Sequence, residues 1–203
     1  MRALPDRWLT ALVEGIGDRA ALTRLFASVG LPDPPTIHVT RGKDQLDRKL
    51  PGINRAARGS SWLVLRDLDH DADCAPELVR SLLPYPSPGM LLRIPVRALE
   101  AWLLADRQGM ARFLGISESR IPEQPETLER PKRSLVDLAR KSRKTALRKD
   151  MVPDPGLSSE VGPAYSARII EFVSRHWDPE RAAVHSDSLN RCLQRLSRLL
   201  VAP

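Results

Sequence analysis

The chain has 203 residues, enough to bury one sizeable hydrophobic core. Hydrophobic residues make up 42% and charged residues 28%, which is typical of a soluble globular protein, and no segment approaches the roughly 18 consecutive apolar residues of a membrane helix. The formal net charge of +7 favours a polyanionic partner such as nucleic acid, although an excess of arginine can also reflect genome composition. Aromatic residues make up only 4% of the chain, which disfavours recognition of nucleic acid by base stacking.

The cysteines and the start of the chain narrow the class of protein further. Cys74 and Cys192 lie far apart without a C-x-x-C pattern, so neither a disulfide framework nor a zinc site is expected. Pro5, Asp6 and Arg7 stand where a signal peptide has its apolar core. We therefore expect a cytoplasmic protein of prokaryotic origin that does not act at a membrane.

The first part of the chain alternates predicted strands and helices. Apolar runs predict strands at residues 9–14, 35–40, 60–67 and 90–96. Helical periodicity predicts helices at residues 18–29, 42–58, 76–83 and 97–114, and Pro51 is expected to interrupt the second of these. This alternation predicts an α/β fold, in which a mainly parallel sheet carries helices on both faces.

Strand patterns stop after residue 115. Residues 118–131 are polar and rich in proline, which predicts a loop, and residues 132–142 predict a helix. Residues 143–163 are expected to be irregular, and two further helices are predicted after them. We therefore expect an α/β domain over residues 1–116, with a C-terminal helical extension over residues 117–203 packed on it.

Acidic residues follow two of the predicted strands. Glu14 ends the first strand, and Asp67, Asp69 and Asp71 follow the third. If the chain stays extended, the three alternating aspartates share one face. Such carboxylates would gather at the carboxyl edge of the sheet and would need a cation, for which Mg²⁺ or Mn²⁺ suits oxygen ligands. The pattern predicts a metal-dependent enzyme that acts on phosphates.

Structural roles stay open for the same residues. Asp67 and Asp69 would also fit a solvated turn after a strand, and Glu14 would fit a carboxylate that caps the helix near Gly15. We expect Asp71 as a supplementary metal ligand. His70 is expected to be a loop residue rather than a metal ligand.

Several segments carry a resemblance to a known family. V-E-G-x-x-D at residues 13–18, followed by D-x-D at residues 67–69 after a hydrophobic strand, resembles the Toprim domain of topoisomerases, bacterial primases and OLD-family (overcoming lysogenisation defect) nucleases. The segments RALEAWLLAD, PKRSL, GPAYS and SLNRCL resemble a prokaryotic family of unknown function that is grouped with the OLD-like Toprim proteins. The resemblance spans most of the chain and implies a Toprim, Rossmann-like fold.

The resemblance also implies roles for individual residues. Glu14 would be a general acid/base or a metal ligand, and Asp67 and Asp69 would bind the metal ion. Glu100 would complete a second metal position, or its side chain would bond a backbone amide. Lys132, in the PKRSL segment, would be the catalytic lysine that stabilises the scissile phosphate.

The chain departs from the OLD-like pattern directly after E-G-x. A threonine or serine followed by an acid is usual there, whereas this chain has Gly17 and Asp18. Asp18 keeps the acid, but the hydroxyl is absent. The segment formed by Gly15, Gly17 and Asp18 is still expected to bind phosphate through backbone N–H groups at a helix N-terminus.

A basic stretch covers residues 130–149. It would follow a nucleic-acid backbone through salt-sensitive phosphate contacts, or it would be a solvated helix face. Its expected nucleic-acid-binding residues are Arg130, Arg133, Arg140, Lys141, Arg143 and Lys144.

The resemblance implies a metal-dependent phosphoesterase, and among these a nuclease for DNA or RNA that acts in anti-phage defence or in another mobile-element setting. It also implies an ATPase partner encoded nearby, because this chain has no G-x-x-x-x-G-K-[ST] motif of its own. One alternative is a non-catalytic Toprim module that binds nucleic acid or the ATPase. Another is phosphotransfer to a small nucleotide or a primase-like activity, for which the sequence indicates no base pocket.

Overall fold

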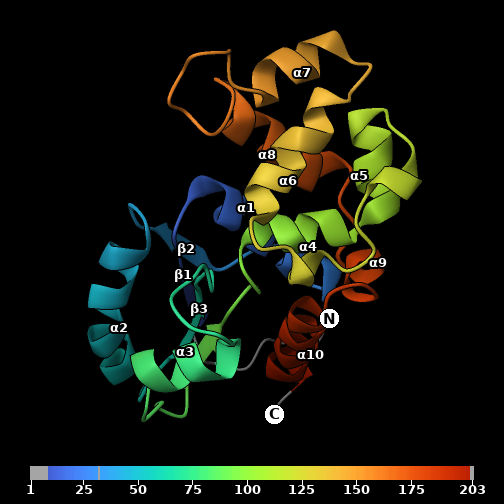
Figure 1. Cartoon of the computed structure of the whole chain (residues 1–203). Coiled ribbons are helices and arrows are strands. Elements are labelled where there is room, and N and C mark those ends of the chain that lie inside the picture. The colour runs from blue at the N-terminus through green and yellow to red at the C-terminus, as the bar shows by residue number, and fades with distance from the viewer. Residues whose placement is uncertain (1–8, 32, 202–203) are drawn as a thin grey trace. The chain divides into compact units, whose positions relative to one another are not determined.

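A computed structural model describes residues 9–31 and 33–201 of the chain (Figure 1). The segment 1–8, on which the signal-peptide expectation depends, lies outside the described residues. Residues group by their contacts into two compact units: the first comprises Met1–Val96 and Arg191–Pro203, and the second comprises Arg97–Asn190. The sequence pattern predicts a division after residue 116, whereas this grouping divides the chain at Arg97.

The first unit contains a four-stranded, all-parallel sheet with the strand order β2-β1-β3-β4. The predicted α/β class with helices around a parallel sheet is confirmed. Because β1 has β2 on one side and β3 on the other, the chain reverses its direction of travel across the sheet between these strands. The elements of this unit are β1 (Leu9–Val13), α1 (Ile16–Ser28), β2 (Thr36–Val39), α2 (Lys43–Ala56), β3 (Ser61–Leu65), α3 (Ala75–Leu82) and β4 (Met90–Arg93).

Hydrophobic packing fixes the helices on the sheet. Leu12 and Val64 point to the face of the sheet that α2 covers with Leu46 and Leu50, and these four side chains belong to one buried cluster. Fully burying a leucine side chain contributes about 1.5–3 kcal/mol. The carboxyl ends of β1 and β3 are therefore held at one edge of a well-packed sheet.

Helix α2 runs without a break through Pro51, so the predicted interruption is wrong. A proline inside a helix removes the hydrogen bond to the carbonyl four residues earlier, which favours a break. Here Leu46 and Leu50 before the proline and Ile53 after it are all buried against the sheet. Packing on both sides of Pro51 thus outweighs the local penalty.

The second unit is helical. Its elements are α4 (Leu99–Ala105), α5 (Arg107–Leu114), the 3₁₀ turns η1 (Glu118–Arg120) and η2 (Pro125–Thr127), α6 (Pro131–Arg140), α7 (Thr145–Met151), α8 (Tyr165–Arg175) and α9 (Pro179–Ala183); α10 (Asp187–Val201) begins in the second unit and ends in the first. Every residue of α4 is buried, and α4 packs against α6, α9 and η2. Helix α4 is therefore the centre of this unit.

Two local features of the second unit differ from the prediction. The helix expected at residues 97–114 divides at Asp106, whose carboxylate accepts the Gly109 N–H at 2.9 Å and so caps α5. The segment 143–163, predicted to be irregular, contains α7, which buries Leu147 and Met151. A pair of apolar residues four positions apart is too short a pattern to distinguish a helix from a loop. None of the helices within residues 9–31 and 33–201 is long and apolar enough to cross a membrane.

Candidate active site

Glu14 and Asp67 meet at the carboxyl ends of the neighbouring strands β1 and β3. The backbone N–H of Asp67 donates a hydrogen bond of 2.9 Å to Oε1 of Glu14. Glu14 does not cap the following helix, because Gly15 is the N-cap of α1. The sheet thus brings these two predicted site residues together where its strand order reverses.

The environment of Glu14 favours its protonated form. The side chain is 17% exposed, and this burial raises the pKa of Glu14 above its ordinary value. The hydrogen bond from Asp67 and the charge of Arg66, 3.9 Å from Oε1, oppose that shift in pKa, whereas the charges of Asp69 and Asp47 reinforce it. A raised pKa brings a glutamate closer to the range in which a carboxyl group can act as a general acid or base.

The aspartates after β3 do not lie on one extended strand, so that expectation is wrong. β3 ends at Leu65, and Asp69 has a φ of 49°, in the left-handed region that aspartate tolerates better than most residues. The Asp71 N–H then donates to the Leu68 carbonyl at 3.3 Å. This turn redirects the chain, so alternation along a strand does not place the side chains of Asp69 and Asp71.

Lys43, in the first turn of α2, binds both aspartates of the turn. Its Nζ lies 3.1 Å from Oδ2 of Asp69 and 2.8 Å from Oδ1 and Oδ2 of Asp71. The hydrogen bond to Asp71, ahead of the contact with Asp69, raises the pKa of Lys43. The lysine is thus a resident counterion of the two carboxylates.

Arg66 is a second counterion and lies deeper. Its side chain is 3% exposed, and its Nη2 lies 3.1 Å from Oδ2 of Asp47 and 2.5 Å from Oδ2 of Asp71. Burial alone would lower the pKa of Arg66, but the hydrogen bonds to Asp47 and Asp71 hold it above its ordinary value. Arg66 therefore stays charged and joins the end of β3 to α2 and to the turn.

Three residues of this site, Lys43, Asp47 and Arg66, were not predicted from the sequence. One signal was present for each: Arg66 follows a buried strand directly, where a charged residue needs partners, and Lys43 and Asp47 are four residues apart at the start of a helix. None of these signals identifies the partner. The contacts from Lys43 to Asp71 and from Arg66 to Asp47 join residues 28 and 19 positions apart.

Five carboxylates gather at this end of the sheet, which bears on whether a metal ion fits. The carboxylates at this end of the sheet are Glu14, Asp47, Asp67, Asp69 and Asp71. Lys43 contacts Asp69 and Asp71, and Arg66 contacts Glu14, Asp47 and Asp71. Carboxylate oxygens are the ligands that Mg²⁺ and Mn²⁺ take. Within the described residues, however, no three His, Cys, Asp or Glu side chains gather as a metal-binding group. The carboxylate oxygens suit a divalent ion, provided that Asp69 gives up its ion pair with Lys43 and binds the metal ion instead.

The expected phosphate-binding segment lies at the N-terminus of α1. The Gly15 N–H donates to Oδ2 of Asp18 at 2.9 Å, so this donor is already engaged. A carboxylate in the first turn also balances the positive end of the helix dipole. Phosphate binding by Gly15, Gly17 and Asp18 remains a prediction, and it requires Asp18 to turn away.

Glu100 and Lys132 meet in the second unit. Glu100 is 7% exposed in the first turn of α4, where its Oε1 accepts the Tyr165 hydroxyl at 3.0 Å and lies 3.8 Å from Nζ of Lys132. Burial first, and then the carboxylate of Glu100, raise the pKa of Tyr165 well above its ordinary value. Glu100 is therefore held by a tyrosine and a lysine rather than by a backbone amide, while its role as a metal ligand stays a prediction.

The basic stretch divides into engaged and available side chains. Arg130 pairs with Glu160, and Arg133 and Arg140 lie 3.5 Å and 3.9 Å from Asp137. Lys144 donates to the Arg112 and Phe113 carbonyls at 3.1 Å and 2.8 Å and so caps the end of α5. The side chains of Lys141 and Arg143 are exposed and make no hydrogen bond or ion pair with any residue that the structure describes. These two side chains are the best candidates for contact with phosphates.

No family model, curated protein or solved structure matches this chain. The likeness to OLD-like Toprim proteins therefore remains a proposal that depends on the motif residues and their positions.

Proposed function

We propose that this protein is an OLD-like Toprim phosphoesterase, a nuclease that cleaves DNA or RNA phosphodiesters with Mg²⁺ or Mn²⁺. The observation that carries the proposal is the hydrogen bond between Glu14 and Asp67, residues 53 positions apart, at the reversal point of a parallel sheet. An acidic pair at that edge, with further carboxylates around it, suits a centre that handles a charged phosphate.

Each residue has a distinct task in this proposal. A divalent ion held by Asp67 and Asp69 would neutralise charge on the scissile phosphate. Glu14, whose pKa burial raises, would take the proton of the attacking water. Arg66 would hold Asp47 and Asp71 in place, and Lys43 would release Asp69 on metal binding.

The proposed setting follows from what the chain lacks in sequence. Since it has no phosphate-binding loop of the ATPase type, we propose that an ATPase encoded nearby acts with it in anti-phage defence in the cytoplasm. The basic stretch, through Lys141 and Arg143, would contribute contacts to the nucleic-acid backbone.

One observation favours the alternative, a non-catalytic Toprim module that binds nucleic acid or a partner ATPase. Lys43 and Arg66 already neutralise part of the carboxylate charge that would otherwise attract a metal ion. If that neutralisation is permanent, the acidic site serves the stability of the fold and not catalysis.

The experiment that separates the two functions measures divalent-ion binding and cleavage together. Calorimetry with Mn²⁺ and cleavage of plasmid DNA, single-stranded DNA and RNA are compared for the wild type, Asp67→Asn, and Asp33→Asn as an exposed acidic control. The nuclease proposal expects metal binding and cleavage in the wild type and the control, and loss of both in Asp67→Asn. A wild type that binds no divalent ion, with or without its ATPase, supports the binding module instead.

A further inference from the structure

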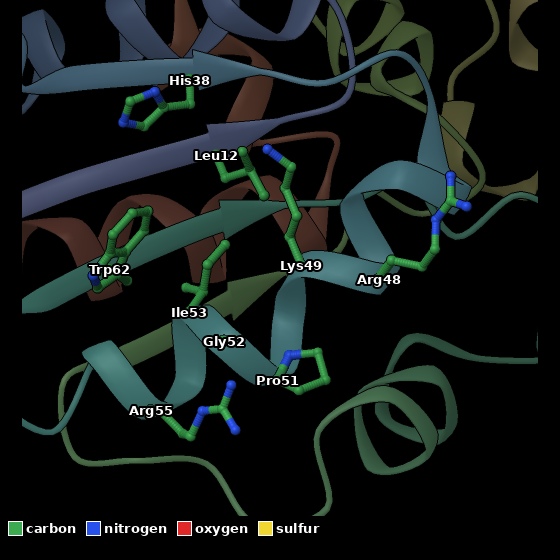
Figure 2. A pocket seen from close by; sticks show the side chains of 9 residues that line it. All are labelled: Leu12, His38, Arg48, Lys49, Pro51, Gly52, Ile53, Arg55 and Trp62. Atoms are coloured by element: carbon green, nitrogen blue, oxygen red, sulfur yellow. The ribbon is translucent and has the colours of Figure 1, made fainter.

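A pocket of about 500 Å³ opens on the first unit, over the face of the sheet that α2 covers (Figure 2). Leu12 and Trp62 line it from β1 and β3, and His38 lines it from β2. The side chains and backbone of α2 complete it. The residues of α2 that line the pocket are Arg48, Lys49, Pro51, Gly52, Ile53 and Arg55.

The pocket is present because α2 covers only part of this face. Its buried residues Leu46, Leu50 and Ile53 pack in the same cluster as Val64 of β3. On β2, the edge strand of the sheet, His38 stays exposed. The part of this face beside His38 is therefore open to a ligand.

Two aromatic rings form one side of the pocket. The rings of His38 and Trp62 lie with their centroids 6.3 Å apart and their planes 20° from parallel. The Trp62 indole N–H donates to Oγ of Ser60 at 3.2 Å, which fixes the orientation of the ring. Figure 2 shows these rings on the strands at either side of Leu12. A planar ring system can stack on such a preformed aromatic surface.

The charged residues that line the pocket are all cations. Arg48, Lys49 and Arg55 line it, and no Asp or Glu among the described residues does. The side chains of Lys49 and Arg55 form no hydrogen bond or ion pair in the part of the chain that the structure describes, and the Arg48 side chain binds only the Asp44 carbonyl, at 3.1 Å. Lys49 extends from α2 toward Leu12 (Figure 2). Unpaired cations beside aromatic rings favour a ligand that is both planar and anionic.

We propose that this pocket binds a nucleoside phosphate, with the base stacked on Trp62 and His38 and the phosphate bound by Lys49 and an adjacent arginine. The nucleotide is either a free one or an unpaired nucleotide of a single strand, since the recognised groups are the same. The proposal does not depend on the nuclease function, because no residue of the acidic site lines the pocket.

The test uses the full chain in buffer with EDTA, so that no divalent ion takes part. Calorimetry measures binding of AMP, of a short oligothymidylate and of inorganic phosphate. Both nucleotide probes, or one of them, should bind more tightly than inorganic phosphate. Binding of AMP alone identifies a free nucleotide as the ligand, and binding of the oligonucleotide alone identifies a single strand.

Variants locate the binding site. Trp62→Ala should weaken binding about 5- to 150-fold, the range for loss of one base–aromatic stack. Because Trp62 is partly buried, His38→Ala and Lys49→Met, both at exposed positions, test the same site without disturbing the core. Arg80→Met, at an exposed position on α3 outside the pocket, should bind as the wild type does. The proposal is overturned if the wild type binds neither nucleotide, if inorganic phosphate binds as tightly as they do, or if His38→Ala and Lys49→Met leave affinity unchanged.

Discussion

The carboxylate of Glu14 accepts the backbone N–H of Asp67 at 2.9 Å, so the end of β1 holds the end of β3 through a side chain. This bond uses a main-chain donor, and it orients the glutamate without using the Asp67 carboxylate. The loop after β3 is therefore tied to the end of β1 through the main chain of Asp67.

Glu14→Gln should separate catalysis from folding. The amide oxygen of glutamine can still accept the Asp67 N–H, so the fold is kept, while proton transfer is lost. On the nuclease proposal, cleavage should fall about 10²–10⁴-fold in metal-dependent assays. Cleavage at the wild-type rate would show that Glu14 is structural.

The same variant should change the pH dependence of stability. The folded-state pKa of Glu14 lies above 4.5, so the folded protein holds a proton that the unfolded chain has lost. Wild-type stability therefore falls as pH rises from about 4.5 through the folded-state pKa. The unfolding free energy of Glu14→Gln should not show this decrease. Above the folded-state pKa of Glu14, the difference in unfolding free energy between the variant and the wild type should no longer change with pH. Urea unfolding between pH 4 and 8, with the exposed Glu123→Gln as control, measures the difference.

Arg66→Met should destabilise the first unit strongly. The change leaves Asp47 and Asp71 without their shared buried cation, and removing one partner of a buried pair costs about 3 kcal/mol or more. The matched control is Arg48→Met, an exposed position on α2, which should change the unfolding free energy by about 0.5 kcal/mol or less. Equal unfolding free energies for the two variants would mean that Arg66 is solvated and contributes little.

Lys43→Met should strengthen divalent-ion binding. The lysine competes with a metal ion for Asp69 and Asp71, and partly exposed ion pairs are worth about 0.2–1 kcal/mol each. Removal of both pairs should therefore lower the Kd for Mn²⁺ about 2- to 30-fold. Lys49→Met, on the same helix, should leave the Kd for Mn²⁺ unchanged. An unchanged or higher Kd for Lys43→Met would place the metal ion away from Asp69.

Asp106→Ala should destabilise the second unit. Asp106 is fully buried, and its carboxylate binds Arg181 at 2.5 Å and the backbone N–H groups of Gly109 and Asp178 at 2.9 Å. Loss of this carboxylate should cost about 3–5 kcal/mol. Asp150→Ala removes a more exposed ion pair, with Arg168, and should cost about 1 kcal/mol or less. Similar losses in thermal unfolding would contradict the structural role of Asp106.

The proposed binding of nucleic acid by the basic stretch is tested by its salt dependence. Lys141→Ala with Arg143→Ala should reduce the slope of log affinity against log salt by about 0.9 for each phosphate that the protein no longer neutralises. Lys144→Ala should instead weaken the end of α5 and leave the slope unchanged. An unaltered slope in the double variant means that the stretch is only a solvated face.

The strands were predictable because apolar runs report burial directly: Leu63, Val64 and Leu65 are a continuous run, and all three are buried. Glu14 and Asp67 were predictable as neighbours because parallel strands end at a common edge. The positions of Lys43 and Arg66 beside these carboxylates could not be predicted, because an ion pair between residues far apart in the sequence produces no periodic pattern. At Pro51 the local sequence predicts a break in the helix, but packing of the residues on both sides keeps α2 continuous.

The order of the two units along the chain has a consequence for synthesis on the ribosome. The first unit includes both Met1–Val96 and Arg191–Pro203, and the whole of the second unit is encoded between them. During translation the sheet can form early, but its unit gains Cys192 and Leu196, both buried, only after the whole second unit has been synthesised. A nascent chain that stalls before Arg191 would therefore carry an incomplete first unit beside a fully synthesised second one, and would be the species most exposed to chaperones and proteases.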